Sequence, residues 1–78
     1  MRSMVSGAQV RPVVGLAVFD GRVAEVFVSD VTARYACVRA IGGAMLPDRF
    51  QLVVAAKDID APCVVTGRRG TLYTILFE

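Results

Sequence analysis

Histidine and tryptophan are absent from this sequence, and lysine occurs once, at Lys57. Without histidine, the side chain that most often acts as a general base near neutral pH is missing. None of the three serines lies in a context typical of an activated nucleophile. Asp58 and Asp60 alternate in a polar segment, a spacing that favours two solvated charges over an acid–base pair. The sequence therefore predicts a protein that is not an enzyme and has no catalytic residues.

Cysteine is scarce as well, with only Cys37 and Cys63, each inside an apolar run. Because no Cys-x-x-Cys pair and no histidine is present, we expect no zinc or haem site. A glycine-rich phosphate loop is also missing, since Gly42-Gly43 precedes a predicted strand instead of opening a helix. We expect no metal and no cofactor, and two buried, reduced thiols.

Long apolar runs are lacking. No run approaches the ~20 residues of a membrane-spanning helix, and residues 1–12 contain no apolar core of the kind found in a secretory signal. We therefore expect a soluble, cytoplasmic protein that does not associate with membranes. The net charge is only +2, and basic and acidic residues alternate along the chain. Nucleic-acid-binding domains usually carry a clustered basic excess, so a nucleic acid polymer is not an expected partner.

Apolar residues, in contrast, make up 55% of the 78 residues. This apolar fraction is enough to build a core and to leave apolar side chains exposed on the surface. Exposed apolar surface indicates a protein partner or self-association. Residues 1–10 mix small and polar types without a period and are interpreted as a flexible N-terminal arm, and residues 11–78 as one domain. Short alternating apolar segments in that domain predict strands. The predicted strands are residues 13–19, 22–29, 34–40, 49–55, 61–68 and 71–77.

Turn signals separate these strands. Asp20-Gly21 is the strongest short hairpin signal, because a type I′ turn needs a positive φ at both central residues. Side chains in the segment 30–32 are suited to capping backbone N–H groups in a turn. Residues 57–62 are predicted as a polar turn, and Arg69-Gly70 as the last hairpin. Six strands at this spacing predict an all-β fold, a six-stranded antiparallel β-barrel.

Three segments of the chain resemble the PilZ family, bacterial domains that bind the second messenger cyclic di-GMP on a six-stranded antiparallel β-barrel. Residues 28–36, VSDVTARYA, are similar to the family's Asp/Asn-x-Ser-x-x-Gly segment between its second and third strands. Residues 46–52, LPDRFQL, look like its Leu-Pro and Phe-x-Leu motif, and residues 62–78 look like its final hairpin. The resemblance spans residues 11–78 and implies a PilZ-like barrel. Because Glu78 directly follows the last predicted strand, the barrel is expected without the C-terminal helix common in the family.

The resemblance also implies a candidate ligand site. The family's arginines in an Arg-x-x-x-Arg motif grip the phosphates of cyclic di-GMP and stack on guanine. Arg11 stands like the second of these arginines, but Gly7 occupies the place of the first, and Arg2 lies nine residues upstream of Arg11. The candidate ligand-binding residues are therefore Arg11, Asp30 and Thr32, with Arg2 as a further candidate.

The second ligand motif is altered too. Asp30 matches it and Thr32 keeps a hydroxyl, but Tyr35 replaces the glycine that lets the backbone approach the ligand. A hydrogen bond to a charged group contributes roughly 1.5–3 kcal/mol. The lost arginine contact and the obstructed glycine site together therefore remove about 3–6 kcal/mol of binding free energy for cyclic di-GMP. Micromolar binding needs about 8 kcal/mol. One hypothesis is that the Tyr35 ring stacks on Arg11 or Arg34 in place of a base; the alternative is that it packs on its own strand face.

Two functions follow from these observations. The first is a small, non-catalytic PilZ-like regulatory or adaptor domain of bacterial cyclic di-GMP signalling, which acts by protein–protein contacts with weak or no ligand binding. The alternative is a functional cyclic di-GMP receptor that holds the dinucleotide between the N-terminal arm and the turn at residues 30–34. The residue at position 7 discriminates between them, because a receptor needs arginine there and this chain has glycine.

Overall fold

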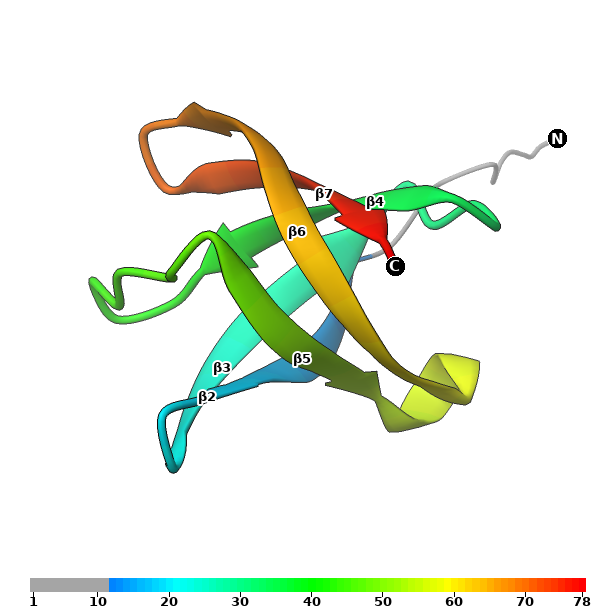
Figure 1. Ribbon diagram of the computed structural model, residues 1–78, viewed down its shortest axis with the longest axis horizontal. Helices are drawn as coiled ribbons and strands as arrows, with labels where there is room; N and C mark the ends of the chain where they lie inside the picture. The colour runs from blue at the N-terminus through cyan, green and yellow to red at the C-terminus, as the bar shows by residue number, and fades with distance from the viewer. Residues whose placement is uncertain (1–11) are drawn as a thin grey trace, which may run out of the picture.

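The structure is a computed structural model that describes residues 12–78. Six antiparallel strands form a closed barrel with the order β2-β3-β4-β7-β6-β5 (Figure 1). The predicted fold class is confirmed: residues 12–78 form strands and one short 3-10 turn, η1 (Ala55–Lys57), and no α-helix. The predicted arm at residues 1–10 and the candidates Arg2 and Arg11 lie outside the described residues. The strands are β2 (Val13–Phe19), β3 (Arg22–Ser29), β4 (Tyr35–Ala40), β5 (Arg49–Val54), β6 (Ile59–Arg69) and β7 (Leu72–Phe77).

The strand directions divide the connections between the two ends of the barrel. At one end, on the left in Figure 1, lie the β2–β3 hairpin, the β4–β5 loop and the β6–β7 hairpin. Asp20 and Gly21 have φ values of 51° and 70°, which confirms the predicted type I′ turn. In the last hairpin the two turn residues are Gly70 and Thr71, one position later than predicted, because Arg69 still pairs with Leu72. The other end holds the β3–β4 turn and η1.

The core lies inside the barrel and follows strand alternation. Side chains at alternate positions of the strands point inward, so each strand contributes between one and three core residues. No charged or polar side chain is buried among the described residues. The buried residues are Ala17, Val26, Val28, Ala36, Val38, Ala40, Leu46, Phe50, Leu52, Val54, Cys63, Tyr73 and Ile75.

The predicted polar turn at residues 57–62 is wrong in its second half. β6 begins at Ile59, and its first residues pair with β5, as in Gln51 opposite Pro62. The acidic residues and the proline in this stretch suggested a loop. The backbone pairing between β5 and β6 overrides that local preference. β6 also contains a register shift between Val65 and Gly67, a β-bulge that the sequence analysis did not anticipate.

Closure of the barrel depends on β2, which pairs with β3 along its whole length and with β5 through residues 16–18. Gly15 faces the interior at this seam. A Cβ atom there would lie 2.9 Å from Val54 Cγ2 and 3.0 Å from the Val53 carbonyl oxygen. The contact with backbone oxygen leaves little room for relaxation, so the close approach of β2 to β5 requires glycine.

We predict that Gly15→Ala lowers the free energy of unfolding by about 1–3 kcal/mol, because the added methyl overpacks the seam. Urea denaturation measures this loss. Gly67→Ala is the matched control: its Cβ would meet nothing nearer than Thr74 at 3.8 Å, so stability should stay within about 1 kcal/mol of the parent. Equal stabilities of the two variants would contradict the role assigned to Gly15.

Candidate functional site

The β3–β4 turn carries the two described candidate residues, and it uses one of them for its own structure. The Thr32 hydroxyl accepts hydrogen bonds from the N–H groups of Arg34 (3.2 Å) and Tyr35 (3.0 Å). It also donates to the Tyr35 carbonyl oxygen at 3.2 Å, and the Thr32 N–H donates to that same oxygen at 2.8 Å. Thr32 therefore caps the turn, as the sequence predicted for this segment, and its hydroxyl is occupied.

Asp30 has a different environment. Its backbone is left-handed, with φ of 52°, and its exposed side chain faces the outer wall of the barrel. There it lines an outer groove of about 270 Å³ together with Pro12, Phe27, Ser29, Arg39 and Leu72. Thr32 lines another hollow, so the structure does not bring Asp30 and Thr32 into one pocket. Pro12, the first described residue, lines this groove together with Asp30.

Tyr35 starts β4 on the outer wall and is 45% exposed. It lies directly opposite Leu76 of β7 and does not line the groove of Asp30. This arrangement agrees with the simpler interpretation, in which the ring packs on its own strand face. The cation–π contact within residues 12–78 is instead between Arg68 and Tyr73, with 5.3 Å between the guanidinium carbon and the ring centroid.

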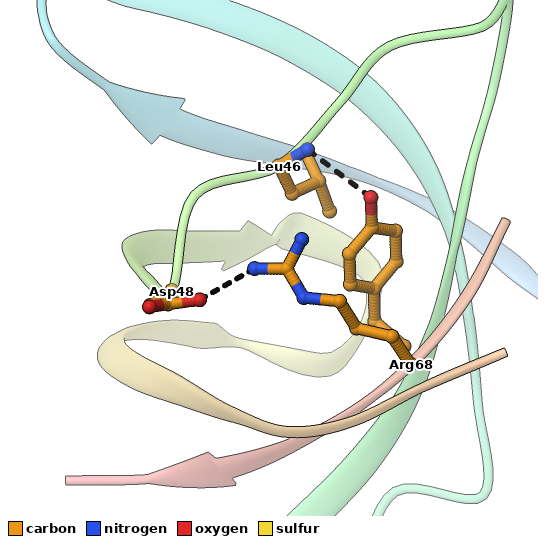
Figure 2. Close-up of polar contacts among 4 residues, drawn as sticks. Leu46, Asp48 and Arg68 are labelled. Atoms are coloured by element: carbon orange, nitrogen blue, oxygen red, sulfur yellow. Dashed lines mark hydrogen bonds and ion pairs between the residues drawn. The ribbon is translucent and has the colours of Figure 1, made fainter. Parts of the chain in front are cut away.

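Arg68 closes one end of the barrel (Figure 2). The bulge in β6 reverses the inside–outside alternation, so Arg68 pairs with the inward-facing Tyr73. Its Nη2 lies 2.5 Å from Asp48 Oδ1, and the Tyr73 hydroxyl accepts a hydrogen bond from the buried Leu46 N–H at 3.3 Å. These contacts hold the β4–β5 loop over this end of the barrel, where the buried side chain of Leu46 covers the core. The sequence did not predict this role of Arg68, because no local signal marks the bulge.

The opposite end of the barrel is open. A hollow of about 500 Å³ lies between the β3–β4 turn and η1. Half-buried Val31, Ile59 and Phe77 supply apolar lining, and Asp58 and Asp60 stand exposed beside it. Gln51 Nε2 donates a hydrogen bond to Asp60 Oδ1 at 2.6 Å. Both carboxylates are solvated, as predicted, so the hollow has no arrangement suited to acid–base chemistry.

The outer surface over β5, β2 and β3 is largely apolar, with Glu25 and Gln51 as polar interruptions. Three directly opposed cross-strand pairs lie there: Val14 with Phe27, Val18 with Val23, and Leu16 with Val53. We call these six residues the β2 face. Val14, Val23 and Phe27 are 53%, 61% and 40% exposed. The composition predicted exposed apolar side chains, and strand pairing brings these six together on the outside of the barrel.

The two cysteines lie on different faces. Cys63 is fully buried and donates a hydrogen bond to the Phe50 carbonyl oxygen at 3.4 Å. Burial, with the Glu78 carboxylate adding to it, raises the pKa of Cys63 to about 11. Cys37 is only partly buried, which corrects the expectation of two buried thiols, because β4 alternation turns it outward. Burial, and then the nearby Asp30 carboxylate, raises the pKa of Cys37 above its ordinary value.

Residues 12–78 contain no group of three or more His, Cys, Asp or Glu side chains placed to hold a metal ion. Within the same residues, no helix is long and apolar enough to cross a membrane.

Comparisons with known protein families, with curated proteins and with solved structures found no match for this chain. The functional interpretation therefore depends on the described geometry and on the resemblance of the motifs.

We predict that Thr32→Val destabilises the protein by about 0.5–1.5 kcal/mol, since it removes the oxygen that caps the β3–β4 turn. Thr32→Ser keeps that oxygen and should stay within a few tenths of a kcal/mol of the parent. Thermal or urea unfolding of both variants tests the prediction. A fully stable Thr32→Val variant would show that the hydroxyl is not a structural cap.

Proposed function

We propose that this chain is a non-catalytic, PilZ-like adaptor domain of bacterial cyclic di-GMP signalling that works in the cytoplasm through protein–protein contacts. The six-stranded antiparallel barrel supports this proposal, since it is the fold that the resemblance implies. The alterations at Gly7 and Tyr35 support the protein-contact mode over the ligand-gated mode. So does the occupied hydroxyl of Thr32, which serves its own turn.

The β2 face is the observation that carries the proposal. Apolar side chains on the outside of a small barrel add nothing to its core, and leaving them in water forgoes roughly 25 cal/mol for each Å² that a partner would cover. An exposed apolar patch of this kind is typical of a protein interaction site. Leu16 lies at the centre of the β2 face. Across the strands it lies opposite Val53 of β5 and Glu25 of β3. Along β2, its neighbours on the same face are the exposed Val14 and the half-buried Val18.

We predict that the isolated protein self-associates through the β2 face when no partner is present. Leu16→Glu should weaken this association at least tenfold, since burying a leucine side chain contributes about 1.5–3 kcal/mol and tenfold corresponds to about 1.4 kcal/mol. Sedimentation equilibrium over a range of concentrations measures it. Met45→Glu is the control, because Met45 is 80% exposed on the β4–β5 loop, away from this face. A parent protein that is monomeric at millimolar concentration, or equal effects of both variants, would contradict the assignment.

A second candidate function, a cyclic di-GMP receptor, is favoured by one observation. The outer groove of Asp30 also contains Arg39 and the exposed ring of Phe27, and it includes Pro12, which follows the candidate Arg11 in the sequence. A carboxylate, a guanidinium and an aromatic ring are groups that recognise a guanine base and a phosphate.

Titration calorimetry with cyclic di-GMP decides between the two functions. For the adaptor we expect no saturable heat at micromolar ligand. For the receptor, Arg11→Ala and Asp30→Ala should each weaken binding tenfold or more, which is the contribution of about 1.5–3 kcal/mol from one charged contact. Micromolar binding that both variants reduce would replace the adaptor proposal with the receptor.

A further inference from the structure

A second groove adjoins the groove of Asp30 on the outer wall. It has a volume of about 270 Å³ and is lined by Gly67, Arg68, Arg69, Leu72 and Thr74. Both grooves include Leu72, so they lie side by side on the surface over β3, β4, β7 and β6. We call the two adjacent grooves together the arginine groove.

One wall of the arginine groove is a row of directly opposed residues on neighbouring strands. Phe27 lies opposite Arg39, Arg39 opposite Leu72, and Leu72 opposite Arg69. The row therefore places one apolar side chain between two arginines.

The two arginines of this row are free to bind an anion. Arg39 and Arg69 are exposed, and neither forms an ion pair within residues 12–78, whereas Arg49 and Arg68 are paired with Glu78 and Asp48. Residues 1–11 contain no aspartate or glutamate that could neutralise them. Asp30, at one end, is the single carboxylate among the residues that line the two grooves.

The spacing of the arginines indicates the shape of the partner. Arg39 and Arg69 are two strands apart, which corresponds to about 9–10 Å between their Cα atoms. Residues seven apart on one face of an α-helix are separated by about 10.5 Å. In an extended peptide, side chains on one face are separated by about 7 or 13 Å, a poorer match.

We propose that the arginine groove binds an acidic amphipathic helix of a partner protein, with carboxylates seven residues apart on Arg39 and Arg69 and an apolar residue between them on Leu72. The inference rests on the proposed function, because it specifies the chemistry of the adaptor's partner. A nucleic acid strand fits less well, since two unpaired arginines with leucine between them offer few phosphate contacts and little of the salt-dependent affinity that such binding needs.

Cys37 provides a built-in reporter for this site. It lies opposite Ser29 and Thr74, which line the two grooves, and it is partly exposed, whereas Cys63 is fully buried. An alkylating reagent at about pH 9 should therefore modify Cys37 selectively. The basic pH is needed because the raised pKa of Cys37 makes the reaction slow at neutral pH. A helix seated in the groove should protect the thiol.

The experiment uses the full chain and two synthetic helical peptides. The first has glutamates at positions i and i+7 and leucines at i+3 and i+4; the second replaces both glutamates with lysine. We expect the glutamate peptide to bind, by fluorescence anisotropy, at least tenfold more tightly than the lysine peptide, and to slow alkylation of Cys37. Arg39→Glu and Arg69→Glu should each weaken binding tenfold or more. Arg22→Glu, in the β2–β3 hairpin, is the matched control and should leave it unchanged.

Equal binding of the two peptides, or an effect of Arg22→Glu as large as that of Arg39→Glu, would overturn the proposal. Tighter binding of a single-stranded oligonucleotide than of the glutamate peptide would overturn it in favour of a polyanion site. Leu16→Glu separates this failure from failure of the adaptor function. If the peptide does not bind but Leu16→Glu still disrupts self-association, the arginine groove is wrongly assigned and the adaptor proposal stands.

Discussion

Closure of the barrel at the β2–β5 seam is the constraint on which the rest of the structure depends. β2 pairs with β5 through only three residues, and at that seam Gly15 leaves no space for a Cβ atom. Because β2 reaches β5, no strand edge is left open and the inward side chains are sealed in one core. The same closure sets the positions of the outer side chains, so the β2 face and the arginine groove are both consequences of it.

The two ends of the barrel are closed to different degrees, and the difference begins at the β6 bulge. One additional residue in β6 turns Arg68 toward Tyr73, and the ion pair with Asp48 holds the loop that carries Leu46. The ion pair is exposed and contributes little by itself. The hydrogen bond to the buried Leu46 N–H matters more, because an unsatisfied buried donor costs about 1–3 kcal/mol. At the other end, the apolar lining of Val31, Ile59 and Phe77 stays partly open to solvent.

The sequence predicted most of the fold because its signals were local. Alternation and the Asp20-Gly21 turn located five of the six strands to within one residue, while β6 began two residues earlier than predicted and the bulge was missed. Those features depend on pairing between strands that are distant in the sequence. The candidate site was less predictable for the same reason. Asp30 and Thr32 are two residues apart, yet a left-handed backbone at Asp30 sends them to different hollows. Arg39, Leu72 and Arg69 become neighbours only through the register in which β4, β7 and β6 pair.

The placement of the two thiols prevents a disulfide between them. Cys63 is enclosed in the core and Cys37 points to the outer wall, with β7 between their strands. Their Cα atoms are therefore about 9–10 Å apart or more, beyond the reach of a disulfide. Burial also raises the pKa of Cys63 to about 11, which keeps that thiol protonated at physiological pH. No covalent cross-link between these two cysteines therefore contributes to closure of the barrel.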